Sequence, residues 1–87
     1  MNIESLREQI DAVDCELLLL LNIRAKIVLE LATIKRDMNI PLYDALRERR
    51  IIERTCRLNR GPLDDSALRS IFNVIIGESR RIVSKIV

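Results

Sequence analysis

The sequence predicts a small all-α fold of three helices, the first of them very long. The chain has two strong turn signals, at Asn39-Ile40-Pro41 and at Asn59-Arg60-Gly61-Pro62. Elsewhere apolar residues recur every three or four positions, which is the period of a helix. The 87 residues include only two Gly and two Pro, too few for the many turns of a β-sandwich or barrel. We therefore expect one helical domain over residues 1–87.

The first predicted helix covers about residues 3–38 and contains no Gly or Pro. Ser5 and Glu8 form a candidate capping box at its start. About 35 residues in a helix extend roughly 52 Å, whereas a compact domain of this size is about 30 Å across. Since the projecting part remains apolar, we expect a second copy of the chain to cover it. The apolar stripe consists of Leu6, Ile10, Val13, Leu17, Leu20, Ile27, Leu31, Ile34 and Met38.

Two shorter helices follow the first turn signal. One is predicted from about Tyr43 to Leu58, and the last from near Asp64 or Asp65 to the end of the chain. Either aspartate is able to cap the last helix. Each of the two longer helices has one polar residue within its apolar stripe, Arg24 in the first and Ser79 in the last.

The composition excludes several kinds of chemistry. Without His, the chain has no Ser-His or Cys-His pair and no imidazole metal site. Cys15 and Cys56 are 41 positions apart and form no CxxC motif. We expect both to be reduced thiols on buried helix faces, and we expect no metal or cofactor. The longest apolar run, Leu17 to Leu21, is far too short to cross a membrane, and no signal peptide is recognisable, so we expect a soluble, cytoplasmic protein.

Arg24 and Lys35 are the first candidates for a binding site. They are eleven positions apart, which places them within about 20° on one helix face and roughly 16 Å along its axis. Long side chains at these positions can bracket one small anion. An unpaired guanidinium in an apolar stripe is costly, so Arg24 needs a carboxylate partner from the protein or from a ligand. A structural salt bridge and a side chain that reaches solvent remain alternatives at this point.

Three further candidates, Asp44, Arg47 and Glu48, share one face at the start of the second predicted helix. The alternative for them is a solvated set of local ion pairs. The alternative for Ser79 is a hydroxyl bonded to the carbonyl four residues earlier.

Arg7 precedes Arg24 by 17 residues, or about 25 Å along the helix. It cannot share a small ligand with Arg24 of its own chain, but in an antiparallel dimer it can reach the partner's site. The six Arg and two Glu between Arg47 and Arg60 also raise the alternative of nucleic-acid binding. A net charge of only +2 and only two aromatic residues argue against it.

Taken together, these residues resemble the all-helical class of chorismate mutase over nearly the whole chain. The pieces occur in the order and at the spacing of that family. They are Leu6-Arg7-x-x-Ile10-Asp11-x-x-Asp14-x-x-Leu17-Leu18-x-Leu20-Leu21-Asn22-x-Arg24, then Ile34-Lys35, then Pro41-Leu42-Tyr43-Asp44-x-x-Arg47-Glu48, and finally Ile71-Phe72-x-x-Ile75-Ile76-x-x-Ser79.

The resemblance implies an intertwined homodimer and an isomerase that needs no cofactor. The implied reaction is the Claisen rearrangement of chorismate to prephenate in the biosynthesis of Phe and Tyr. By resemblance, Arg24 and the partner's Arg7 grip the two carboxylates of chorismate, and Lys35 donates to its ether oxygen.

The remaining implied contacts come from the other two helices. Glu48, with the region of Asp44, holds the ring hydroxyl of the substrate. Arg47 and Ser79 complete the contacts to the carboxylates and the ring.

The sequence departs from the family pattern at Val83, where many members have Gln or Glu that helps to donate to the ether oxygen. Two other functions therefore stay open. One is a relative that acts on a similar dianion, an isochorismate-pyruvate lyase or an aminodeoxychorismate mutase. The other is a weakly active, mutase-like regulatory module that docks on another enzyme of the shikimate pathway.

Overall fold

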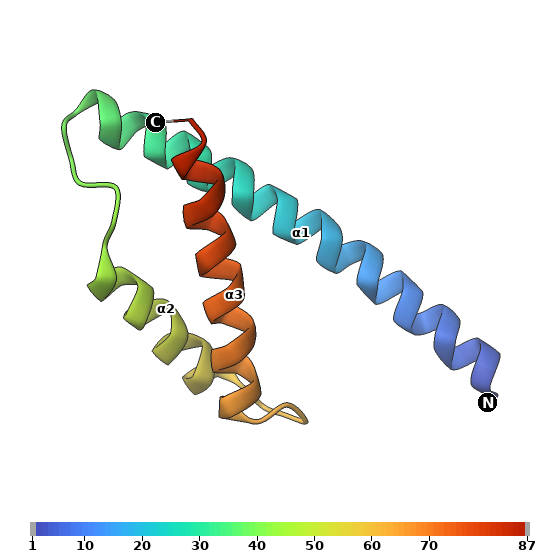
Figure 1. Cartoon of the computed structure of the whole chain (residues 1–87). Helices are drawn as coiled ribbons and strands as arrows, with labels where there is room; N and C mark the ends of the chain where they lie inside the picture. Colours follow the sequence, from blue (N-terminus) through green and yellow to red (C-terminus); the bar gives the residue numbers. More distant parts are fainter. Residues whose placement is uncertain (1, 87) are drawn as a thin grey trace.

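The computed structural model describes residues 2–86 and contains three α-helices (Figure 1). They are α1 (Ile3–Asp37), α2 (Ala45–Leu58) and α3 (Asp65–Ser84). The described range contains no strand. The predicted all-α fold with a very long first helix is confirmed.

Helix α1 begins at a different cap from the one predicted. The side chain of Asn2 accepts a hydrogen bond from the backbone N–H of Ser5 at 2.8 Å, so Asn2 is the cap and Ser5 lies inside the first turn. At the other end, Asn39 adopts a left-handed φ of 57°. The N–H groups of Asn39 and Ile40 donate to the carbonyls of Arg36 and Lys35, which closes the helix before Pro41.

Aspartates cap both shorter helices. The Asp44 carboxylate accepts from the backbone N–H of Arg47 at 2.9 Å, so α2 begins at Ala45, two residues after the predicted start. Of the two candidate caps of the last helix, Asp64 is the one used, because it accepts from the N–H of Ala67 at 2.8 Å. That helix ends at Ser84, before the predicted end at Val87, which lies outside the described residues.

Helix α3 is the element that holds the chain together. It packs against both α1 and α2, whereas no Cα atom of α1 lies within 8 Å of one of α2. In Figure 1, α2 and α3 form an antiparallel pair, and α3 meets only the C-terminal half of α1. The buried core is correspondingly small and takes one residue from each helix, namely Ala32, Ile51 and Ile76.

The N-terminal half of α1 extends away from the other helices, and the chain is 55 Å long but only 24 by 16 Å across. Its apolar side chains are uncovered in the single chain, with Ile10 58% exposed and Leu20 61% exposed. The prediction that this helix outgrows its own domain is therefore confirmed. Uncovered apolar area of this extent marks an interaction surface.

Both cysteines are free, but they do not both lie on buried faces. Cys56 is partly buried between α2 and α3, whereas Cys15 is exposed. The prediction for Cys15 is wrong for the single chain, because no helix of that chain packs against this part of α1. Within residues 2–86, no helix combines the length and the apolar character needed to cross a membrane.

Candidate functional site

A pocket of about 470 Å³ lies where the three helices and the loop before α2 come together. This volume falls in the range typical of small-molecule sites. Seven of the eight predicted site residues line it. The lining side chains include Arg24, Lys35, Asp44, Arg47, Glu48, Ser79 and Val83, with Tyr43 and Arg80 beside them and a floor formed by Ile27, Val28, Leu31, Leu42, Ile51 and Ile76.

Helix α1 supplies one wall of the pocket from a single face. Arg24, Leu31 and Lys35 all line it, and their spacing of seven and then four residues keeps them on the side of α1 that meets α3. The predicted shared face of Arg24 and Lys35 is therefore present.

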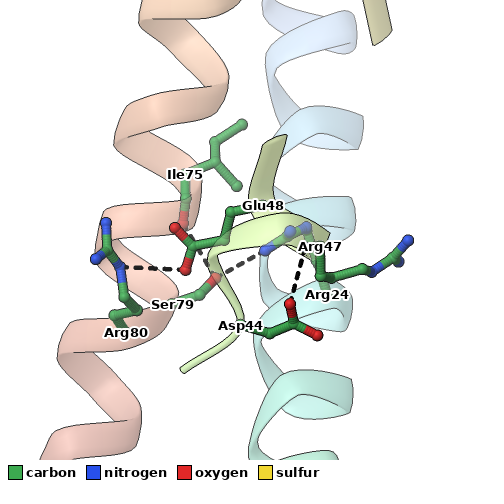
Figure 2. Close-up of polar contacts among 7 residues, drawn as sticks. All are labelled: Arg24, Asp44, Arg47, Glu48, Ile75, Ser79 and Arg80. Atoms are coloured by element: carbon green, nitrogen blue, oxygen red, sulfur yellow. Dashed lines mark hydrogen bonds and ion pairs between the residues drawn. The ribbon is translucent and has the colours of Figure 1, made fainter. Parts of the chain in front are cut away.

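Arg24 is fixed by a hydrogen bond across the helix interface. Its guanidinium donates to the Ser79 hydroxyl at 2.7 Å, and that hydroxyl donates in turn to the carbonyl of Ile75 at 3.0 Å (Figure 2). The i−4 bond considered for Ser79 is thus formed, and it leaves the oxygen free to receive Arg24. The two polar residues that interrupt the apolar stripes are partners of each other.

Three cations of the pocket have no carboxylate partner within the described chain. Arg24, Lys35 and Arg47 form no ion pair with any carboxylate of residues 2–86. Within residues 2–86, Arg24 therefore does not form the structural salt bridge considered from the sequence. Since Arg24 and Lys35 are half-buried, their charge favours an anion brought by a ligand.

The charges around the pocket have a net excess of two positive units. Arg24, Lys35, Arg47 and Arg80 contribute four positive charges, and Asp44 and Glu48 contribute two negative ones, so the difference is 4 − 2 = +2. Such a pocket is complementary to a small dianion.

The start of α2 is not the local ion-pair set considered from the sequence. Asp44 uses one oxygen to cap the helix through the N–H of Arg47. Glu48 faces α3 instead, where its carboxylate lies 3.4 Å from Nε of Arg80, and its side chain is only 22% exposed (Figure 2). The two carboxylates thus hold different positions on the rim and wall of one pocket.

Tyr43, Arg80 and Ser84 are the polar pocket residues that the sequence did not indicate as site residues. The guanidinium carbon of Arg80 lies 5.3 Å from the centre of the Tyr43 ring. The only available signal was the position of Arg80 directly after Ser79. Because consecutive helical residues point about 100° apart, Arg80 lies off the apolar stripe that drew attention to Ser79.

Two other predicted residues occupy informative positions. Val83 lines the pocket one turn after Ser79 and offers it no polar atom, as the spacing predicted. Arg7 does not line the pocket, since it lies near the far end of α1.

Three helices that surround a pocket with two excess positive charges form a small α-domain suited to binding a small anion. Residues 6–83 match the family described as chorismate mutase type II, so the chain belongs to the chorismate mutase type II family.

One curated relative is the bifunctional chorismate mutase/prephenate dehydratase of Aquifex aeolicus (strain VF5). It is 38% identical over 88 residues, which include 97% of this chain and 24% of the relative. The chain thus spans about a quarter of the length of that relative.

The chain is also similar to solved structures of chorismate mutases. Form II of the chorismate mutase from Thermus thermophilus superposes with a TM-score of 0.92 at 30% identity, over 94% of this chain and 93% of that one. The chorismate mutase from Helicobacter pylori in complex with prephenate gives a TM-score of 0.87 at 32% identity, over 95% of this chain and 90% of that one.

Proposed function

We propose that this chain is a chorismate mutase, an isomerase that converts chorismate to prephenate in the biosynthesis of Phe and Tyr. The observation that carries the proposal is the pocket with two excess positive charges, in which Arg24, Lys35 and Arg47 have no carboxylate partner in residues 2–86. Chorismate is a dicarboxylate and supplies the two missing negative charges.

The chemistry of this rearrangement suits a pocket without a nucleophile. The reaction is unimolecular, so catalysis requires that the substrate be held in its reactive conformation and that developing charge be stabilised. Gripping both carboxylates selects the folded conformer of the substrate. A fixed donor at the ether oxygen stabilises the negative charge that grows there as the C–O bond breaks.

In our proposal, Arg24 binds one carboxylate, aimed by its bond to Ser79. Lys35 is half-buried on the same face of α1 as Arg24 and donates to the ether oxygen. Glu48, with the region of Asp44, accepts from the ring hydroxyl.

Arg47 and Ser79 complete the contacts to the carboxylates and the ring. Arg47 lies in the first turn of α2, and its backbone N–H donates to the Asp44 carboxylate that caps the helix. Ser79 lies opposite on α3 and takes part through the hydroxyl that also receives Arg24.

We further propose that the active form is an intertwined homodimer in which Arg7 acts in trans. The apolar surface of α1 supports this, because the residues from Ile3 to Leu20 that line it are 42% to 69% exposed in the single chain. Arg7 lies on that projecting half, about 25 Å from Arg24 of its own chain by helical rise. An antiparallel second α1 brings the partner's Arg7 to this pocket and covers both stripes.

A cytoplasmic location is part of the proposal. Its support is that both cysteines are free thiols, which is the usual state in a reducing compartment.

Val83 favours a second candidate within the same class. An apolar residue at this wall of the pocket leaves the ether oxygen with one donor fewer than many family members provide. A relative that acts on another chorismate-like dianion, either an isochorismate-pyruvate lyase or an aminodeoxychorismate mutase, is therefore the alternative.

The function is tested by incubating the purified chain with chorismate and, separately, with isochorismate. We expect chorismate to be converted to prephenate, an isomer of equal mass, as followed by chromatography and mass spectrometry. Release of pyruvate from isochorismate together with inert chorismate would replace the mutase proposal with the lyase. No turnover of either substrate would leave the aminodeoxychorismate mutase or a non-catalytic module.

Removal of either unpaired cation of α1 should abolish turnover and leave the fold intact. Arg24→Ala and Lys35→Ala should each lower kcat/KM by at least about a hundredfold, because each removes a contact to charge in the transition state. Lys26→Ala is the matched control, since Lys26 is exposed on α1 and does not line the pocket. Far-UV circular dichroism melts beside kinetic assays separate this outcome from a structural role, which would lower the melting temperature and spare activity.

A mixing experiment tests whether Arg7 acts in trans. When inactive Arg7→Ala chains exchange with inactive Lys35→Ala chains, each heterodimer contains one intact site. Equal mixing should then restore about a quarter of wild-type activity per chain, since half of the dimers are mixed. A mixture of Arg24→Ala with Lys35→Ala is the control, because it leaves a defect in every site. Equal recovery in both mixtures, or none in the first after proven exchange, would contradict action in trans.

Val83→Gln should increase the chemical rate. A positioned donor is worth up to about 3 kcal/mol, so we expect an increase of about ten- to a hundredfold in kcat. Burial of an amide should also lower the stability of the free enzyme, measured by urea unfolding. Val83→Leu is the control, since it fills the same position without a donor. An unchanged or lower rate for Val83→Gln would show that residue 83 does not reach the ether oxygen or that chorismate is not the substrate.

A further inference from the structure

Two consecutive residues of α3 connect α1 and α2. Ser79 receives the hydrogen bond from Arg24 of α1 at 2.7 Å. Arg80 forms an ion pair at 3.4 Å with Glu48 of α2, and this is the only ion pair between different helices in residues 2–86 (Figure 2). Besides the loop that joins α1 to α2, α3 therefore helps to place Glu48 relative to Arg24, and Arg80 supplies the charged contact of Glu48.

Glu48 requires a partner that keeps it in one orientation. Its side chain has three rotatable bonds and is 22% exposed, so most of its surroundings are protein. Arg24, Lys35 and Arg47 line the same pocket and form no ion pair with a carboxylate of the described chain. A Glu48 carboxylate released from Arg80 would be drawn to these cations, because opposite charges that line one pocket attract each other.

Arg80 is itself held by an aromatic ring. Its guanidinium carbon lies 5.3 Å from the centre of the Tyr43 ring, within the range of a cation–π interaction. Tyr43 belongs to the loop directly before α2, so Arg80 joins three segments: that loop, α2 and α3. The ring face limits the orientations of the guanidinium, whose Nε lies 3.4 Å from the Glu48 carboxylate.

We propose that Arg80 is a positioning residue for the proposed rearrangement. It holds the Glu48 carboxylate at the place where the ring hydroxyl binds and away from the cations that bind the substrate carboxylates. Arg80 acts through Glu48 and does not itself grip the substrate. This inference rests on the proposed function.

The test is a cycle of four proteins: wild type, Arg80→Met, Glu48→Gln and the double variant. Arg80→Met should lower kcat/KM about tenfold, mainly through a higher KM, because the released Glu48 competes with the substrate carboxylates. In the Glu48→Gln background the same substitution should change kcat/KM by less than about twofold, because no carboxylate remains to be held. Arg80→Lys should recover part of the lost affinity, since it keeps the charge but not the planar guanidinium.

Arg81→Met is the matched control. Arg81 is the next residue on α3, pairs with Glu78 of the same helix and does not line the pocket. We expect its kcat/KM to stay within about twofold of wild type. An equal loss from Arg80→Met with and without the Glu48 carboxylate would show that Arg80 binds the substrate directly and would overturn the inference.

Urea unfolding of the same four proteins gives a readout that does not depend on turnover. If the ion pair forms, the midpoint shift of the double variant is smaller than the sum of the two single shifts. Strictly additive shifts would overturn the inference whether or not the chain converts chorismate. Absence of turnover in the wild-type protein, by contrast, would contradict the proposed function alone.

Discussion

The pocket depends on the packing of α3 against the other two helices. Because no backbone of α1 lies against α2, the distance between Arg24 on one wall and Glu48 on the other is set by the packing of both helices on α3 and by the loop of residues 38–44 that joins them. Ser79 and Arg80 make the two polar connections, at 2.7 and 3.4 Å. Each helix contributes only one buried residue to the core that supports this arrangement. A single chain therefore has the outline of the site but little packing to hold it.

The charge of the pocket and the apolar surface of α1 each indicate a partner that the single chain lacks. The pocket has two positive charges in excess, which matches a dicarboxylate. The projecting half of α1 exposes an apolar stripe, which matches a second copy of the chain. Arg7 lies on that half, so in our account the surface that drives dimer formation also delivers a cation to the neighbouring pocket. Association and substrate binding would then be linked in one structure.

Periodicity and turn residues were sufficient to predict the three helices, since the breaks at Pro41 and Pro62 left few alternatives. Helix ends were less predictable, because Asn2 and Ser5 are both good caps and only the backbone decides between them. In the site, Arg24 and Ser79 were recognisable because they interrupt apolar stripes. The pairing of Arg80 with Glu48 depends on how α3 crosses α2, which no local pattern encodes. Cys15 was misjudged because no helix of the chain packs against that part of α1, and Cys15 lies on the side of α1 opposite the apolar stripe of Val13 and Leu17.

The most direct test of this account is sedimentation of the chain with chorismate turnover assayed across the gradient. If two chains share each site, all activity sediments with a species of twice 10.1 kDa, and dilution to the monomer abolishes turnover. A folded species of 10.1 kDa with full turnover per chain would contradict it.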